Sequence, residues 1–297
     1  MTHNKNKFRL ALDTRVLVSD GAMGTMLQQK GLAAGECAEE WNISHTEVVR
    51  TIHKAYIDAG ADIIETNSFG GNRSRLSLHG FGDKVVEFNS TAVQLARSIC
   101  PSNKFIAGSV GPSGEFLEPM GSATYEKLYD IFSEQIIALI SAGVDLIIIE
   151  TMSDVTEVRA AATATRDING DIPLILSMTF EKSPAGFYTM MGITPEQAVQ
   201  MLEELKPDAI GSNCGNGAPE MLELMKVFRS LTSLPLLAQA NAGKPILNGN
   251  EYSYSELPEE RGEYARQLLE LGVNIIGGCC GTTPEHISAI RSVIDKK

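Results

Sequence analysis

Two adjacent cysteines near the C-terminus, Cys279 and Cys280, are the residues of this chain best suited to metal chemistry. Glycines flank them in the segment Gly277-Gly-Cys-Cys-Gly281, which follows a short strand-like run, 273–276. Adjacent side chains on a regular strand point to opposite faces, so both sulfurs can face one ligand only if the chain leaves strand geometry, which glycine permits. A third thiol, Cys214, ends another such run. Three thiols at two strand ends predict a metal site with one open position, and soft sulfur ligands favour zinc.

The alternative is that these thiols are small buried hydrophobes, which is common for free cysteine. A disulfide between the neighbours Cys279 and Cys280 would be strained. The other two cysteines, Cys37 and Cys100, lie away from the predicted strand ends, and we interpret them as structural.

The elements that would position the thiols are eight apolar runs alternating with helical stretches. The runs are nearly continuous, as is typical of strands covered on both faces. Eight such units predict a (β/α)8 TIM barrel in the α/β class, one domain over residues 1–297 with about 1–13 as an N-terminal extension; a doubly wound open sheet is the alternative. The strands are expected at 16–19, 63–66, 105–110, 146–150, 174–179, 209–213, 236–240 and 273–278, with helices at 46–59, 83–100, 124–142, 155–166, from 194, 219–231 and 258–271.

Polar residues follow several of these strands, and in a barrel those positions share the C-terminal rim, where active sites are built. The loop Asp20-Gly21-Ala22-Met23 either is a simple turn or holds a small carboxylate on its backbone N–H groups. Glu150 either caps the next helix, with Asp154 as a competitor, or binds a substrate ammonium group. Asn241 either is a turn residue or supplies a neutral oxygen near the metal.

Composition excludes several classes of function. The net charge of −12 argues against a nucleic-acid surface, which needs clustered Lys and Arg. The apolar runs are strand-sized, so no membrane span is expected, and residues 1–13 lack the apolar core of a secretory signal. Five cysteines, an odd number, indicate a reducing compartment, so we expect a cytoplasmic protein. The sequence leaves open whether the chain forms a homo-oligomer.

Taken together, the motifs after the strands resemble those of the homocysteine S-methyltransferase family. Within that family the chain is most similar to the homocysteine-binding domain of cobalamin-dependent methionine synthases, from about Val16 onward. The motifs are Asp20-Gly-Ala-Met-Gly-Thr25, Glu65-Thr-Asn-Ser-Phe69, Glu150-Thr151, Asn213-Cys214, Asn241-Ala-Gly243 and Gly277-Gly-Cys-Cys-Gly-Thr-Thr-Pro284.

The resemblance implies a (β/α)8 barrel that binds one Zn²⁺ through Cys214, Cys279 and Cys280, with the Asn241 oxygen completing the site when substrate is absent. It also implies that Glu150 and Asp20 fix the homocysteine amino group and pocket, with the Gly21, Ala22 and Met23 backbone near its carboxylate. The implied reaction is methyl transfer to the homocysteine thiolate, giving methionine.

The methyl donor is the open point. The chain is too short to hold the folate, cobalamin and activation domains of a methionine synthase, so the leading hypothesis is methylcobalamin on a separate corrinoid protein that docks at the rim. S-methylmethionine or betaine is the alternative; a quaternary ammonium donor would want an aromatic cage, to which Trp41, Phe69, Phe116, Phe180 and Phe187 are candidates.

Two rival functions remain. A non-catalytic barrel subunit would bind homocysteine or zinc without turnover. A barrel lyase or aldolase would want a strand-end lysine or a rim histidine, and Lys244 is the only lysine near a strand end.

Overall fold

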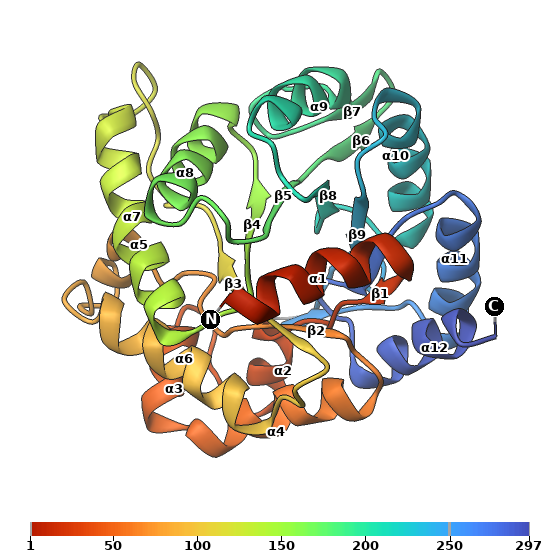
Figure 1. Ribbon diagram of the computed structural model, residues 1–297, viewed down its shortest axis with the longest axis horizontal. Helices are drawn as coiled ribbons and strands as arrows, with labels where there is room; N and C mark the ends of the chain where they lie inside the picture. The colour runs from red at the N-terminus through yellow and green to blue at the C-terminus, as the bar shows by residue number, and fades with distance from the viewer. Residues whose placement is uncertain (1, 249–250, 297) are drawn as a thin grey trace.

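The computed structural model describes residues 2–248 and 251–296, and these residues form an eight-stranded parallel barrel surrounded by helices (Figure 1). Neighbouring strands follow the order β1-β12-β9-β8-β5-β4-β3-β2, and a parallel bridge between Ser19 and Ile63 joins the two end strands. The sheet therefore closes on itself, which confirms the predicted (β/α)8 barrel and excludes the open doubly wound sheet. The barrel strands are β1 (Leu17–Val18), β2 (Ile63–Glu65), β3 (Phe105–Val110), β4 (Leu146–Met152), β5 (Leu174–Met178), β8 (Ala209–Asn213), β9 (Leu236–Ala240) and β12 (Ile275–Gly278).

The helices pack outside this ring, and the predicted ones are present to within a few residues. The helix expected from residue 194 begins as its sequence indicates, with the Thr194 side chain accepting a hydrogen bond from the Gln197 backbone and Pro195 in its first turn. In the described part of the chain no helix is both long enough and apolar enough to cross a membrane. The helices are α1 (Thr2–Thr14), α2 (Gly24–Gln29), the 3-10 turn Ala38–Glu40, α3 (Trp41–Ser44), α4 (Thr46–Asp58), α5 (Arg73–Ser77), α6 (Val85–Ile99), α7 (Tyr125–Ala142), α8 (Val155–Ile168), α9 (Pro195–Glu204), α10 (Ala218–Leu231), α11 (Pro258–Glu270) and α12 (Pro284–Ile294).

The N-terminal segment is a helix that closes the lower end of the barrel, the end at which the strands begin. Phe8 and Leu12 of α1 join the apolar cluster inside the barrel, and the Phe8 ring meets the edge of Phe105, the first residue of β3, at 5.3 Å between centroids. Arg9 pairs with Asp208, directly before β8. Figure 1 shows α1, in red, lying across this end. The opposite end, at the strands' carboxyl termini, is left for the site.

Two short hairpins that the sequence analysis did not predict extend the C-terminal rim. The first, β6 (Glu181–Ser183) with β7 (Gly186–Tyr188), follows β5. The second, β10 (Ile246–Asn248) with β11 (Glu251–Ser253), follows β9. Each is too short and too polar for an alternating apolar pattern to mark it.

Candidate metal centre and substrate pocket

The three rim thiols converge. The Sγ atoms of Cys214, Cys279 and Cys280 all lie within 4.8 Å of one another, and those of Cys214 and Cys280 are 4.0 Å apart. Among the described residues this is the one group of three or more metal-ligating side chains close enough to share an ion. All five cysteines of the chain are free thiols. Cys37 and Cys100 lie elsewhere, as predicted.

The backbone leaves strand geometry at both strand ends, which is how the sulfurs come to face one point. Cys214 follows β8 with a φ of 59°, a left-handed conformation that is uncommon outside glycine, and Gly215 follows it at 67°. After β12, Gly281 adopts a φ of 77°, and the Thr282 N–H donates to the Cys279 carbonyl at 3.0 Å to close a turn. The predicted departure from strand geometry around Cys279 and Cys280 is confirmed.

The thiols share negative charge unequally. Hydrogen bonds to the Cys214 sulfur from the other two thiols lower the pKa of Cys214 to about 3. The same contacts raise the pKa of Cys279 and raise that of Cys280 to about 12. A bound cation would favour the thiolate form of all three sulfurs.

The surroundings of the thiols fit a divalent metal with soft ligands. Asn241, 4% exposed at the end of β9, hydrogen-bonds to the Cys214 sulfur, yet its Oδ1 has no hydrogen-bond partner among the described residues. A buried oxygen without a partner costs free energy unless something else binds it. Three thiols with one such oxygen make the donor set expected of zinc.

A buried guanidinium holds the loops that carry these ligands. Arg261 of α11 donates to the carbonyls of Ala240, Asn241 and Gly277 at 3.1, 2.6 and 3.3 Å, and pairs with the Glu256 carboxylate. Its side chain and that of Glu256 are 3% and 6% exposed. The ends of β9 and β12 are thereby tied together directly beneath the thiols.

Tyr254 covers the cluster from the segment after the second hairpin. Its hydroxyl hydrogen-bonds to the Cys280 sulfur, and burial followed by that sulfur's charge raises the pKa of Tyr254. Gly281 is required here, because a Cβ at this position would lie 2.1 Å from the Tyr254 ring.

A cavity of about 250 Å³ opens beside the thiols at the carboxyl ends of the strands. Most of the predicted site residues line it: Asp20, Gly21, Ala22, Met23, Glu150, Cys214, Cys279 and Cys280. Asn241 does not line it and contacts the site through its hydrogen bond to Cys214. Gly21 allows the chain to pass close by, because a Cβ there would lie 2.9 Å from the Tyr56 ring and the Thr282 carbonyl.

Three carboxyl groups, those of Asp20, Glu65 and Glu150, line the same cavity as the thiols, and we call them the carboxyl floor. Glu65 of β2 and Glu150 of β4 hydrogen-bond to each other, and the Asp20 carboxyl accepts from the Glu65 backbone N–H at 2.9 Å. Ser109 donates to Glu150 at 2.5 Å, and Gln239 donates to Glu65 at 2.6 Å. Asp20 Oδ1 has no partner in the described residues.

Burial and mutual repulsion favour the protonated forms of these carboxyls. Burial raises the pKa of Asp20 and of Glu150, and the charge of Glu65 raises each further. Burial also raises the pKa of Glu65. A cation entering the cavity would favour the ionised forms, so this floor is suited to an ammonium group and would release a proton on binding one.

Asn213 links the floor to the thiols. Its Nδ2 donates to Glu150 at 3.2 Å and lies 3.9 Å from the Cys279 sulfur, while its Oδ1 accepts from Ser177 and from the Thr151 N–H. Each hydrogen-bonding atom of the amide is used, so the distance between the carboxyl floor and the thiols is fixed.

Sequence reasoning quoted Glu65 and Asn213 only as parts of motifs and gave no role to Gln239 or Tyr254. Glu65, Asn213 and Gln239 could have been found from their positions at strand ends. No sequence signal marked Tyr254, because the hairpin before it was not predicted. Lys244 is 71% exposed, forms an ion pair with Glu220 and lines no part of the cavity. It therefore cannot act as the active-site lysine that a lyase or aldolase would need.

The family model described as homocysteine S-methyltransferase matches residues 17–294. Methionine synthases of Mycobacterium leprae (strain TN) and Mycobacterium tuberculosis (strain ATCC 25618 / H37Rv) are 32% and 33% identical over 300 residues, covering 95% of this chain. The chain spans only 24% and 25% of the length of those relatives.

Among solved structures, the apo form of the homocysteine methyltransferase MmuM from Escherichia coli is 25% identical, with a TM-score of 0.73 and coverage of 95% of this chain and 97% of that one. The family model covers nearly the whole barrel, including every strand that carries a thiol or a floor carboxyl. The chain therefore belongs to the homocysteine S-methyltransferase family.

Proposed function

We propose that this chain transfers a methyl group to the thiolate of L-homocysteine, giving methionine, with zinc held by Cys214, Cys279 and Cys280. The methyl donor in this proposal is methylcobalamin carried by a separate corrinoid protein. The observation that carries the proposal is one cavity with three thiols on one wall and three buried carboxyls on its floor. Homocysteine has one thiol and one ammonium group to match them.

The metal would be held by the three sulfurs, with Asn241 Oδ1 as the fourth donor when the substrate is absent. When bound, zinc keeps a coordinating thiol deprotonated near neutral pH, where a free thiol with a pKa of about 8.5 is mostly protonated and unreactive. Three cysteine thiolates exceed the charge of Zn²⁺, so the substrate sulfur keeps its nucleophilic charge.

The protein's own residues orient the substrate. The floor of Asp20, Glu65 and Glu150 would bind the ammonium group, and the backbone of Gly21 to Met23 would bind the carboxylate. With both ends of the amino acid fixed, the side-chain sulfur reaches the thiol wall, which is the positional advantage that an enclosed site provides.

The chemical step is an in-line displacement at the methyl carbon. A lone pair on the homocysteine sulfur forms the new S–CH3 bond while the Co–CH3 bond breaks. Both electrons of the broken bond stay on cobalt, giving cob(I)alamin. The thiol proton has already left for solvent, so no further proton moves in this step.

A second candidate keeps the acceptor and changes the donor to S-methylmethionine or betaine. One observation favours it. The match covers 97% of the E. coli homocysteine methyltransferase, so that enzyme is a barrel of about the same size as this chain. Against it, the aromatic residues named for a cage are scattered. Trp41 stacks on His45, Phe180 is fully buried, and Phe69 lines the cavity beside the thiols.

The test compares donors and metal states on the same preparation. Reduced chain, zinc-stripped with a chelator or reloaded, is mixed anaerobically with homocysteine and each donor in turn. We expect methionine from methylcobalamin only in the reloaded sample. Methionine from S-methylmethionine or betaine instead would overturn the donor, full activity after stripping would overturn the zinc, and silence with every donor would favour the non-catalytic subunit. We also expect a cytoplasmic location, because the free thiols need a reducing compartment.

A further inference from the structure

Gln239, near the end of β9, lines the cavity beside the thiols and is 2% exposed. Its Nε2 donates to the Glu65 carboxyl at 2.6 Å and to the Ser19 hydroxyl at 3.1 Å. Its Oε1 is buried and has no hydrogen-bond partner among the described residues. A buried amide oxygen without a donor costs free energy, so this atom is suited to a donor that arrives with a ligand.

The neighbouring strand leaves room for the Gln239 side chain to cross the inside of the barrel. Gln239 pairs in register with Gly277 of β12. A Cβ at Gly277 would lie 2.7 Å from the Cβ of Ser19, so a side chain there would not fit. Because this position is glycine, the Gln239 amide spans β12 and reaches Ser19. The two hydrogen bonds that Nε2 donates fix the orientation of the amide and leave Oε1 available.

A second oxygen without a partner belongs to the same cavity of about 250 Å³. Asp20 is 2% exposed, and its Oδ2 accepts from the Glu65 backbone N–H at 2.9 Å. Its Oδ1 has no partner in the described part of the chain. Asp20 directly follows Ser19, the residue to which Gln239 donates. Two acceptors without donors in one small cavity therefore favour a ligand group that carries several N–H bonds.

The other two carboxyls of the floor already have hydrogen-bond donors. Glu150 accepts from Ser109 and from Asn213 through different oxygens, at 2.5 and 3.2 Å. Glu65 accepts two hydrogen bonds through Oε1 and also hydrogen-bonds to Glu150. An ammonium group bound only at these two carboxyls would share acceptors that are in use, whereas the two partnerless oxygens have no competing donor.

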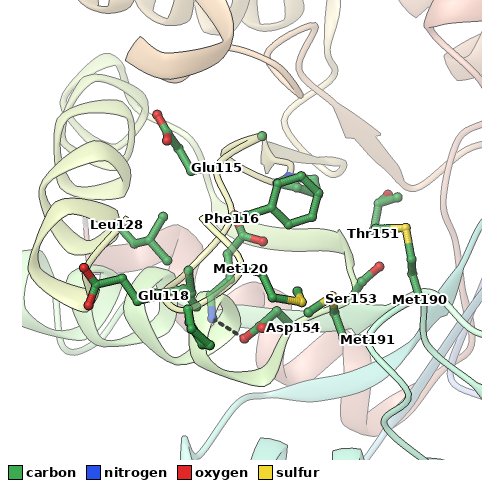
Figure 2. Close-up of a pocket in the computed structure, with 15 residues that line it drawn as sticks. Glu115, Phe116, Glu118, Met120, Leu128, Thr151, Ser153, Asp154, Met190 and Met191 are labelled. Atoms are coloured by element: carbon green, nitrogen blue, oxygen red, sulfur yellow. Dashed lines mark hydrogen bonds between the residues drawn. The ribbon is translucent and has the colours of Figure 1, made fainter. Parts of the chain in front are cut away.

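A larger cavity of about 480 Å³ on the same rim also has carboxyl groups, but their oxygens have partners (Figure 2). Glu115 pairs with Lys127 at 3.0 Å, and Glu157 accepts from the Ser113 hydroxyl at 2.5 Å. Asp154 accepts from the Glu157 backbone N–H at 3.2 Å, a bond drawn in Figure 2. None of the described residues that line this cavity has a buried side-chain oxygen without a partner. Of the two cavities, the one beside the thiols is therefore the better site for an ammonium group.

We propose that Gln239 is a substrate-binding residue, and that its Oε1 and Asp20 Oδ1 accept hydrogen bonds from the ammonium group of the thiol substrate. The inference rests on the proposed function and adds to it a residue that makes the site select thiols with a free amino group. The carboxyl supplies charge, and the amide supplies a second acceptor without adding another charge to a crowded floor. A thiol acid that lacks the amino group leaves both oxygens without a donor, and a site of this kind rejects it.

The experiment is calorimetric binding of two thiols to the reduced, zinc-loaded chain. The thiols are L-homocysteine and 4-mercaptobutyrate, which is the same molecule without the amino group. Gln239→Met and, independently, Gln239→Leu remove Oε1 and keep an apolar side chain of similar size. We expect each to weaken homocysteine binding about tenfold, the size expected for a hydrogen bond to a charged group. The Kd for 4-mercaptobutyrate should change by less than about twofold, since this thiol makes no contact with Oε1.

Two further variants separate this contact from a structural effect. Gln239→Glu also loses the amide that donates to Glu65 and Ser19, but it keeps an oxygen at the same place and should retain the preference for homocysteine. Gln135→Met is the matched control. Gln135 is fully buried, its Oε1 also has no partner, and its Nε2 donates to the Ser68 carbonyl, yet it lines no part of the cavity. This variant should keep the wild-type preference.

The outcomes distinguish this inference from the proposed function, and none of them depends on the methyl donor. If the wild type prefers homocysteine and Gln239→Met and Gln239→Leu keep that preference, the ammonium group is held elsewhere and the inference alone is wrong. If Gln239→Glu or Gln135→Met loses the preference as fully as Gln239→Met, the effect is structural and the inference is also wrong. If the wild type binds both thiols equally, the ammonium site of the proposed function fails and the inference fails with it.

Discussion

Cys280 supplies one of the three sulfurs of the proposed metal centre and accepts the Tyr254 hydroxyl. Replacing it with serine removes a soft thiolate from the donor set. We expect Cys280→Ser to lose zinc during dialysis against a chelator and to lower the rate of methionine formation by at least about 100-fold, the upper end of what loss of a supporting residue costs a metal site. Cys100→Ser is the control and should keep both. Wild-type activity in a zinc-free Cys280→Ser protein would refute the metal assignment.

We expect Glu65 to affect substrate binding because its charge raises the pKa of Glu150. Burial and then Glu65 raise the pKa of Glu150, and a substrate ammonium group binds the ionised form. The KM for homocysteine should therefore rise as the pH falls through that pKa. Glu65→Gln keeps the shape and removes the charge, so the pKa of Glu150 falls and the rise in KM moves to lower pH.

This pH shift is measured from the KM for homocysteine across the pH range in which both proteins stay folded. Glu134, a carboxyl of α7 that pairs with Arg73, lines no part of the cavity, so Glu134→Gln is the control and should leave the profile in place. A profile that moves to higher pH in Glu65→Gln would contradict the arrangement of the floor.

At the scale of residues, the sequence contained the ligands but not all of their surroundings. Cys214, Cys279, Cys280, Asp20 and Glu150 could be predicted because each follows an apolar run, and the ends of parallel strands meet on one rim. The carboxyl pair of Glu65 and Glu150 could not, because these residues belong to β2 and β4, which β3 separates, and their contact depends on the curvature of the barrel wall. Tyr254 reaches Cys280 from a hairpin whose sequence has no distinctive period.

At the scale of elements, Arg261 of α11 holds the loops that carry the proposed metal ligands. A lysine at this position has one ammonium group and cannot satisfy Glu256 and three backbone carbonyls together. We expect Arg261→Lys to weaken zinc affinity about 10- to 100-fold, measured by competition with a chromogenic chelator. Arg266→Lys, on the same helix with exposed partners Glu263 and Glu270, should leave zinc affinity unchanged. Equal affinities in wild type and Arg261→Lys would show that the loops hold their shape without this clamp.

Helix α1 acts on stability and is remote from the chemistry. Phe8 is fully buried in the lower end of the barrel, so Phe8→Ala should lower the free energy of unfolding by about 3–5 kcal/mol. The measurement is denaturant unfolding, with zinc affinity and the KM for homocysteine unchanged in the folded protein. Loss of zinc affinity at unchanged stability would contradict the separation of the two ends.

The prediction of elements succeeded where burial imposes a pattern. All eight barrel strands are nearly continuous apolar runs because both of their faces are covered, and the structure confirms each of them. The segment 1–13 is polar enough to resemble an extension, yet α1 buries Phe8 and Leu12 on one side. A single apolar face with few members gives little signal until the surface that it covers is known.

At the scale of the whole molecule, the chain is a barrel that corresponds to about a quarter of its methionine synthase relatives. All residues of the proposed acceptor site belong to this barrel, because the thiols and the carboxyl floor come from its own strand ends.

The most direct measurement is an anaerobic single turnover. Reduced, zinc-loaded chain is mixed with homocysteine and free methylcobalamin, and the cobalamin spectrum is followed while methionine is quantified. We predict conversion to cob(I)alamin with one methionine formed for each methyl group lost. Methionine formed from S-methylmethionine or betaine while the methylcobalamin spectrum stays unchanged would contradict the account.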